Sequence, residues 1–130
     1  MAKPIKVTNK LLCELVSPSN NNKHTLVNVY SGDIIVSDMP SHLQLGLYIE
    51  AAVSSEYQGT LQLEIRWLRK AIIRGETKVV GKASEGTAVI VLPSFNLPLD
   101  RDGVLDVFFS GDGIRRQKLM SKKIYKGPTS

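Results

Sequence analysis

Apolar and polar residues alternate with a period of two along two segments of the chain. Between Leu43 and Val53 every odd-numbered position is apolar, and the same alternation returns between Thr60 and Trp67. Successive side chains of a β-strand point to opposite faces of a sheet, so each segment is predicted to be a strand with one buried face. The intervening Ser54–Gly59 is too short for a parallel crossover, which indicates an antiparallel connection.

Shorter apolar and β-branched runs predict further strands, separated by residues that favour turns. These runs are Leu11–Val16, Thr25–Tyr30, Asp33–Ser37, Thr87–Leu92 and Val104–Ser110. Thr87–Leu92 is almost wholly apolar, so we expect a central strand that Pro93 ends. Asp112-Gly113 readily adopts the positive φ angles of a hairpin turn, and Arg115–Tyr125 is therefore expected to return as a charged edge strand.

The segment Ile65–Gly75 permits two interpretations. Its apolar residues have the spacing of one helix face, and its final glycine is suited to end a helix. The alternative continues the preceding strand, turns near Arg69-Lys70 and forms a hairpin around Arg74-Gly75-Glu76. We favour the strand, because Trp67 keeps the two-residue period and Ile72-Ile73 favours β structure.

These elements predict an all-β protein, a sandwich or a small barrel, of which we favour a single antiparallel β-sandwich of seven to nine strands, immunoglobulin-like in outline. The 130 residues suffice for one domain with its own core, and residues 1–8 and 127–130 are expected to be frayed ends.

No apolar run approaches the ~20 residues of a membrane-spanning helix, and no secretory signal is evident. With the single cysteine, Cys13, this predicts a cytoplasmic protein.

Most of the chain resembles the small β-sandwich domains of unknown function found in bacterial and phage proteins: it has a polar opening, a long alternating strand, a second strand with polar outward residues and the late segment Leu92–Val107. The late segment is also similar to the corner before a late strand of immunoglobulin-like domains, where Asp-x-Gly-x-Tyr is common. Leu105 occupies the position of that tyrosine, so the hydrogen bond of a tyrosine corner is missing. The resemblance implies the fold and a bacterial or phage origin, and it brings no catalytic residues.

Residues suited to catalysis or metal binding are few and scattered. His24 and His42 have no Cys, Asp or Glu at ligand spacing, and one cysteine cannot make a structural zinc site. Asp100, Asp102 and Asp106 lack the glutamate that closes a calcium-binding loop, and turn geometry explains them. We therefore predict no catalytic residue, no metal and no cofactor. An enzyme whose site the sequence does not reveal is kept as a third hypothesis.

Three further residues with reactive side chains have ordinary explanations. Cys13 lies within a predicted strand and is expected to be a buried, inert thiol. Glu50 and Glu64 are carboxylates that neighbouring strands can set opposite one another, as glycosidases do. We interpret both as solvent-facing residues.

The charge is unevenly distributed along the chain. Residues 1–65 contain four Lys and six acidic residues, whereas residues 66–130 contain thirteen Lys and Arg and six acidic residues. A first basic group lies on the predicted C-terminal strand and is our candidate partner-binding site: Arg115, Arg116, Lys118, Lys122 and Lys123. A second basic group lies in and around the ambiguous segment: Arg66, Arg69, Lys70 and Arg74.

A clustered basic surface suits an acidic protein or a nucleic acid, and it also suits a solvated edge strand. Single-strand binders add aromatic rings for base stacking, but Tyr30, Tyr48 and Tyr57 lie in the acidic half. We therefore predict a non-catalytic interaction protein that contacts a protein partner through the first basic group and the sheet faces. Nucleic-acid binding by the same group with Arg66, Arg69 and Lys70 is the alternative.

The sequence also suggests a surface for self-association. Gly46 and Ala52 leave low relief beside Tyr48 on the outward face of a predicted strand, which would permit two copies to pack as a homodimer. No membrane contact is predicted.

Overall fold

The computed structural model describes residues 5–19, 23–53, 58–80 and 87–127, which form nine β-strands and no helix. The strands are β1 (Ile5–Pro18), β2 (His24–Val29), β3 (Ile34–Val36), β4 (Ser41–Val53), β5 (Gln58–Trp67), β6 (Lys70–Val80), β7 (Thr87–Leu99), β8 (Gly103–Gly111) and β9 (Ile114–Lys126). In this part of the chain, accordingly, no helix has the length and apolar character needed to span a membrane.

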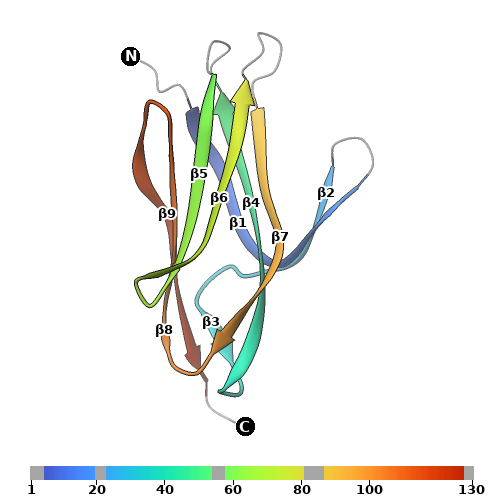
Figure 1. Ribbon diagram of the computed structural model, residues 1–130. Helices are drawn as coiled ribbons and strands as arrows, with labels where there is room; N and C mark the ends of the chain where they lie inside the picture. The colour runs from blue at the N-terminus through green and yellow to red at the C-terminus, as the bar shows by residue number, and fades with distance from the viewer. Residues whose placement is uncertain (1–4, 20–22, 54–57, 81–86, 128–130) are drawn as a thin grey trace.

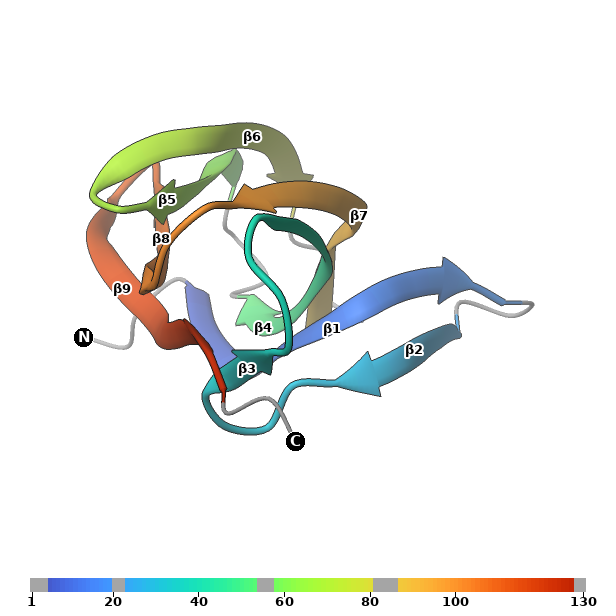
Figure 2. The same cartoon turned by 90° about the horizontal axis from the view of Figure 1, so that it is seen from below.

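The described strands make two packed sheets. Sheet A has the order β2-β1-β4-β7, and sheet B has the order β3-β9-β8-β5-β6. Figure 1 shows the strands of both sheets from the side, and Figure 2 shows them from below. The predicted all-β, sandwich-like architecture is confirmed. The prediction that every strand pair is antiparallel is wrong, because β3 runs parallel to β9 through Ile34–Val36 and Ile124–Lys126.

The core lies between the sheets and is built from the alternating residues that the sequence marked. On β4 the odd-numbered residues from Leu45 to Ala51 are buried, and on β5 those from Leu61 to Trp67 are buried. Strand β8 contributes Leu105, Val107 and Phe109 to the same core. The opposite faces of these strands therefore carry the side chains that solvent or a partner can reach.

Two expectations about strand neighbours are wrong. β4 and β5 lie in different sheets, so the chain between them crosses from sheet A to sheet B instead of closing a hairpin; residues 54–57 are outside the described part. β7 is an edge strand and not a central one, and it continues through Pro93. The register between β4 and β7 shifts at this point, and a proline is tolerated there because an irregular edge needs no donor from it.

The segment that permitted two interpretations is β structure. Trp67 pairs with Lys70 across a tight turn, in which Leu68 and Arg69 have positive φ angles of 54° and 67°. No second hairpin forms around Arg74-Gly75-Glu76, because these residues continue β6 opposite Gln62–Glu64 of β5. The strand interpretation is therefore confirmed, but its prediction of a second hairpin at these residues is wrong.

The hairpin of β1 and β2 extends beyond the rest of sheet A on one side of the molecule (Figures 1 and 2), because β1 pairs with β4 only as far as Cys13 and with β2 from Cys13 to Pro18. Where β1 ends its pairing with β4, it passes close to Gly46. A Cβ atom on Gly46 would lie 2.7 Å from the carbonyl oxygen of Pro93 and 3.2 Å from the backbone nitrogen of Val16. Gly46 is therefore buried by neighbouring backbone and does not leave the open surface that the homodimer hypothesis required of it.

The ends of the described chain are held by hydrogen bonds. Residues 5–8, which were expected to fray, belong to β1 and pair with β4, and Ile5 is only 1% exposed. At the other end the backbone N–H of Gly127 donates to the carbonyl of Val36 at 2.9 Å. The expectation of fraying is wrong for these residues, while residues 1–4 and 128–130 are outside the described part.

Candidate functional site

The outer face of sheet B carries a row of functional side chains that the strand register sets side by side. Arg74 of β6 is directly opposite Glu64 of β5, Glu64 is opposite Phe108 of β8, and Phe108 is opposite Lys118 of β9. In a sheet, residues directly opposite one another have neighbouring side chains on the same face. The row therefore places a cation, a carboxylate, an aromatic ring and a second cation next to one another across four strands.

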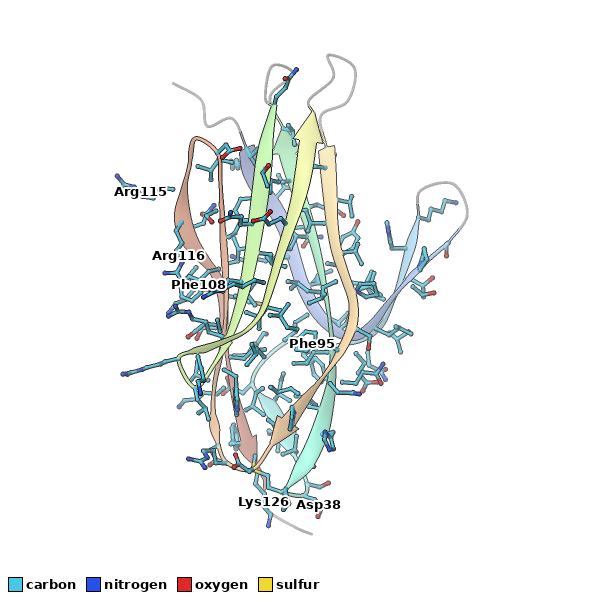
Figure 3. The ribbon with its side chains drawn as sticks, viewed as in Figure 1. Asp38, Phe95, Phe108, Arg115, Arg116 and Lys126 are labelled. Atoms are coloured by element: carbon cyan, nitrogen blue, oxygen red, sulfur yellow. The ribbon has the colours of Figure 1, made fainter. Side chains whose placement is uncertain are left out.

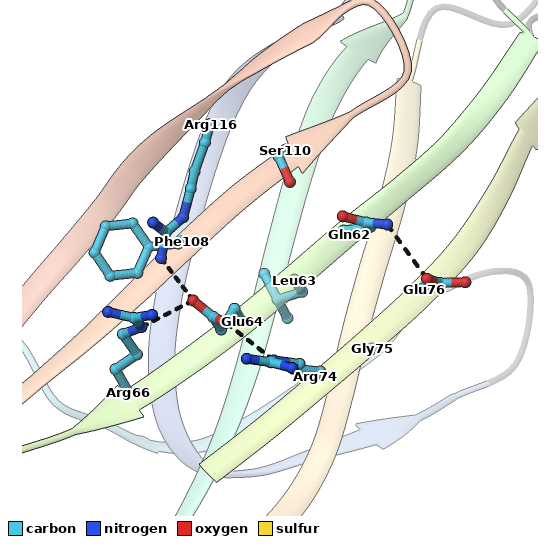
Figure 4. A pocket seen from close by; sticks show the side chains of 10 residues that line it. All are labelled: Gln62, Leu63, Glu64, Arg66, Arg74, Gly75, Glu76, Phe108, Ser110 and Arg116. Carbon is cyan, nitrogen blue, oxygen red and sulfur yellow. Dashed lines mark hydrogen bonds and ion pairs between the residues drawn. The ribbon is translucent and has the colours of Figure 1, made fainter. Parts of the chain in front are cut away.

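Glu64 is the centre of this row and binds arginines from different strands. Its Oε1 accepts from Nε of Arg74 at 3.0 Å, and its Oε2 accepts from Nε of Arg66 at 3.0 Å. Oε2 also accepts from Nη2 of Arg116 at 2.6 Å, an arginine 52 positions along the chain (Figure 4). We call Glu64, Arg66, Arg74 and Arg116 the Glu64 cluster.

The ionisation of Glu64 follows from this environment. Partial burial raises the pKa of the carboxyl, while the hydrogen bonds and charges of Arg74, Arg66 and Arg116 lower it. The arginines together outweigh burial, so the pKa of Glu64 lies below its ordinary value. The carboxylate is charged at neutral pH and holds the arginines together on the sheet.

Phe108 supplies an aromatic ring among these cations. The guanidinium carbon of Arg116 lies 4.1 Å from the centre of the ring, and that of Arg66 lies 5.8 Å away. Nζ of Lys118 is also 5.8 Å from the ring centre. Cations are attracted to the negative face of an aromatic ring, so Phe108 helps to fix the side chains that surround it.

The cations of this face are more exposed than the carboxylates that balance them. Glu64 and Asp106 are 19% and 16% exposed, whereas Arg74 and Arg116 are 74% and 49% exposed. Asp106 is a distant partner for Lys118, at 3.7 Å, and it accepts a shorter hydrogen bond from Ser121. A molecule that approaches the sheet meets positive charge first. We call the Glu64 cluster together with Phe108, Asp106 and Lys118 the basic face.

The basic face contains an open hollow of about 430 Å³. Figure 4 shows that it is lined by the Glu64 cluster, by Phe108 and by polar side chains above them. Ser110 lines the hollow near Arg116, and Gln62 donates to Glu76 at 3.3 Å along the same wall. The hollow thus combines guanidinium, hydroxyl and amide donors, which suit carboxylate and phosphate groups.

The structure brings together part of the first basic group. Arg116 and Lys118 belong to the basic face, but Arg115 points away from the sheets (Figure 3). Lys122 donates from Nζ to the carbonyl of Tyr30 at 3.2 Å and so ties β9 to the chain that follows β2. Lys123 lines a separate hollow with Asp33 and Asp102, among other residues. Although the residues of the first basic group are close in sequence, the structure places them in different parts of the surface.

The second basic group is divided in the same way. Arg66 and Arg74 join the Glu64 cluster. Arg69 lies in the turn between β5 and β6, and Lys70 begins β6, so neither lines the hollow of the basic face. Sequence reasoning named Arg66 and Arg74 for their charge and missed that one carboxylate joins them to β9.

Other candidate residues lie elsewhere. Glu50 is on β4 in sheet A and Glu64 is on β5 in sheet B, so the two do not lie on neighbouring strands and cannot form a facing pair of carboxylates there. Glu50 instead accepts from the hydroxyl of Tyr48 at 2.7 Å, and the rings of His24 and Tyr48 meet in a T-shaped contact. Cys13 is fully buried, as expected, and burial raises the pKa of its thiol.

Neither the protein-family models nor the curated proteins compared with this sequence include a match to it.

Proposed function

We propose that the protein is a non-catalytic interaction module whose basic face binds an acidic surface of a protein partner. One observation carries this proposal. Exposed guanidinium groups from β5, β6 and β9 converge on a single half-buried carboxylate, Glu64, and keep unused N–H donors that face solvent. Guanidinium groups bind carboxylates in forked pairs, and complementary charge accelerates and selects protein association.

The shape of the basic face supports a protein partner. The hollow is open, and the aromatic side chain of Phe108 lies among its arginines and other polar residues. Arginine and aromatic residues are enriched in protein interfaces, where they supply most of the binding energy. An acidic segment of a protein partner would match this surface.

Nucleic-acid binding is the alternative, and the position of Phe108 argues against it. The guanidinium of Arg116 lies over the Phe108 ring at 4.1 Å, so the ring is not free to stack on a base. Arg69 and Lys70, on which the nucleic-acid hypothesis also relied, lie outside the hollow.

The experiment compares two ligands under identical conditions. A fluorescent peptide of alternating Glu and Ser and a single-stranded thymidine oligonucleotide are titrated with the full chain at low and physiological salt. We expect the acidic peptide to bind at both salt concentrations, and a matched Lys-Ser peptide not to bind. Tighter binding of the oligonucleotide, lost steeply as salt rises, would instead support the alternative.

We further infer that the sandwich is immunoglobulin-like in outline and that the protein works in the cytoplasm. The packing of an antiparallel sheet A on the larger sheet B supports the first inference. The buried, unpaired thiol of Cys13 is compatible with the second. Neither inference changes the proposed role of the basic face.

A further inference from the structure

Strand β6 is the edge of sheet B nearest the Glu64 cluster, and its backbone has no neighbour on that side among the described strands. The other described edges are protected. β2 and β3 are short, with six and three residues, and β7 contains Pro93 and Pro98. Short strands and prolines discourage pairing with another molecule. β6 has eleven residues and no proline, so it is the edge best suited to receive another strand.

The sequence of β6 is complementary to itself in one antiparallel register. Gly75 is the middle residue of Lys70–Val80, so two copies that overlap along the whole strand have their twofold axis at Gly75. In this register Arg74 of one copy lies opposite Glu76 of the other, and the symmetry repeats the pair. Opposite charges directly across from each other stabilise an antiparallel pair.

Neighbouring registers that keep the side chains on the same faces set like charges against each other. Moving the axis from Gly75 to Arg74 places the two copies of Arg74 opposite one another. Moving the axis to Glu76 places the two copies of Glu76 opposite one another. Like charges directly opposite destabilise a strand pair, so the charges select the register centred on Gly75.

The side chains around this edge are compatible with a second strand. Arg74 and Glu76 lie on the outer face, where they contact Glu64 and Gln62. On the inner side the edge opens onto an apolar slot of about 110 Å³, lined by Ile73, Ile90 and Leu92 among others. Ile73 of a second copy would extend this apolar lining.

We propose that two copies of the chain pair through their β6 strands, so that sheet B continues across a homodimer. Arg74 of each copy binds Glu76 of its partner, using the donors that Glu64 leaves free. The two basic faces then lie on the same side of one continuous sheet. The pairing does not depend on an acidic ligand and stands or falls separately from the proposed function.

The test uses charge exchange in the full chain, with mass measured by light scattering after size-exclusion chromatography. The wild type is expected to be a dimer. Arg74→Glu and Glu76→Arg should each be monomeric alone, because each sets like charges opposite one another. An equimolar mixture of the two should form a heterodimer, and the double variant R74E/E76R should form a homodimer again.

Control measurements separate pairing from folding and from ligand binding. Circular dichroism should show the same β content for every variant. Arg116→Glu, a charge reversal on the same face but away from β6, should remain dimeric. A monomeric wild type at every concentration tested, a dimeric R74E, or a failure of both the mixture and the double variant to restore the dimer would overturn the proposal. If the acidic peptide fails to bind while the chain still dimerises, only the proposed function is contradicted.

Discussion

Arg116 and Phe108 form the contact that organises the basic face. The guanidinium carbon lies 4.1 Å from the centre of the ring, while Nη2 of the same side chain binds Glu64. One arginine on β9 thus joins an aromatic residue of β8 to a carboxylate of β5. This contact fixes a cation over the ring and links the three strands on the outer face of sheet B.

We expect a measurable coupling free energy between Arg116 and Phe108. Phe108→Leu keeps much of the apolar volume but removes the aromatic face, and Arg116→Gln removes the charge. A double-mutant cycle in urea should give a coupling of about 0.5–1 kcal/mol, the value of a partly exposed cation–π pair. Strict additivity of the two single changes would show that the contact contributes nothing.

Glu64→Gln should destabilise the fold at neutral pH by about 1 kcal/mol, since the amide loses its charge-assisted bonds while the arginines are partly screened by solvent. The pKa of Glu64 is lowered in the folded protein, so its stabilising contribution is present above the ordinary value of 4.5 and is lost as pH falls through the folded pKa. The free-energy difference between wild type and E64Q should therefore shrink as pH is lowered from about 5.

The matched control for that experiment is Glu76→Gln. Within one chain Glu76 is exposed and accepts one hydrogen bond from Gln62, so at a concentration at which the chain is monomeric its replacement should change the unfolding free energy by less than about 0.5 kcal/mol at any pH. A pH-independent difference for E64Q would contradict the assigned role of its charge.

The same Glu64→Gln change should strengthen binding of the acidic Glu-Ser peptide, although it weakens the fold. Neutralising Glu64 removes the internal competitor for the arginines, and about 0.5–1 kcal/mol of gained attraction corresponds to roughly two- to five-fold tighter binding. Fluorescence anisotropy at physiological salt measures it. Weaker binding by a folded E64Q would mean that Glu64 positions the arginines for the ligand instead of competing with it.

Gly46→Ala should be strongly destabilising, by about 1–3 kcal/mol. A methyl group there would meet the carbonyl oxygen of Pro93 and the backbone of Leu15 and Val16, none of which can rotate away. Gly32→Ala is the control, because a Cβ at Gly32 has no neighbour within 4 Å. Thermal and urea denaturation of both variants check this, and equal stabilities would be inconsistent with the close passage of β1.

Arg69→Gly should stabilise the protein by about 0.5–1 kcal/mol. Arg69 has a φ of 67°, a left-handed conformation that glycine adopts without the steric penalty of a side chain. Lys70→Gly, one position later and inside β6, should have the opposite sign because it only adds flexibility to a strand. Urea denaturation compares them, and a less stable R69G would imply that the arginine side chain holds the turn.

Local pattern predicted the strands well, since a buried face requires an apolar residue at every second position, as β4 and β5 show. Strand partners were harder to predict, because alternation tells which face is buried but not which strand lies alongside. The sequence therefore did not reveal that β4 and β5 belong to different sheets or that β7 lies at an edge.

The sequence predicted only part of the candidate site, because charge along the chain does not show which side chains share a face of the sheet. Charge density identified Arg116 and Lys118 but also Arg115, and only the fold separates them. The register between β8 and β9 shifts near Phe108, and simple alternation does not anticipate such an irregularity. Phe108 is opposite Glu64 and Lys118 only through strands distant in sequence, so no local motif marks it as the centre of the basic face.

The central claim is that the basic face binds acidic ligand, and the comparison of Arg116→Glu with Arg115→Glu tests it most directly. The two variants make the same charge change at adjacent residues, but Arg116 is in the Glu64 cluster and Arg115 points away from the sheets (Figure 3). Titration of the Glu-Ser peptide should show at least about ten-fold weaker binding for R116E and a near wild-type affinity for R115E. Equal loss in both variants would indicate a nonspecific effect of net charge and contradict the account.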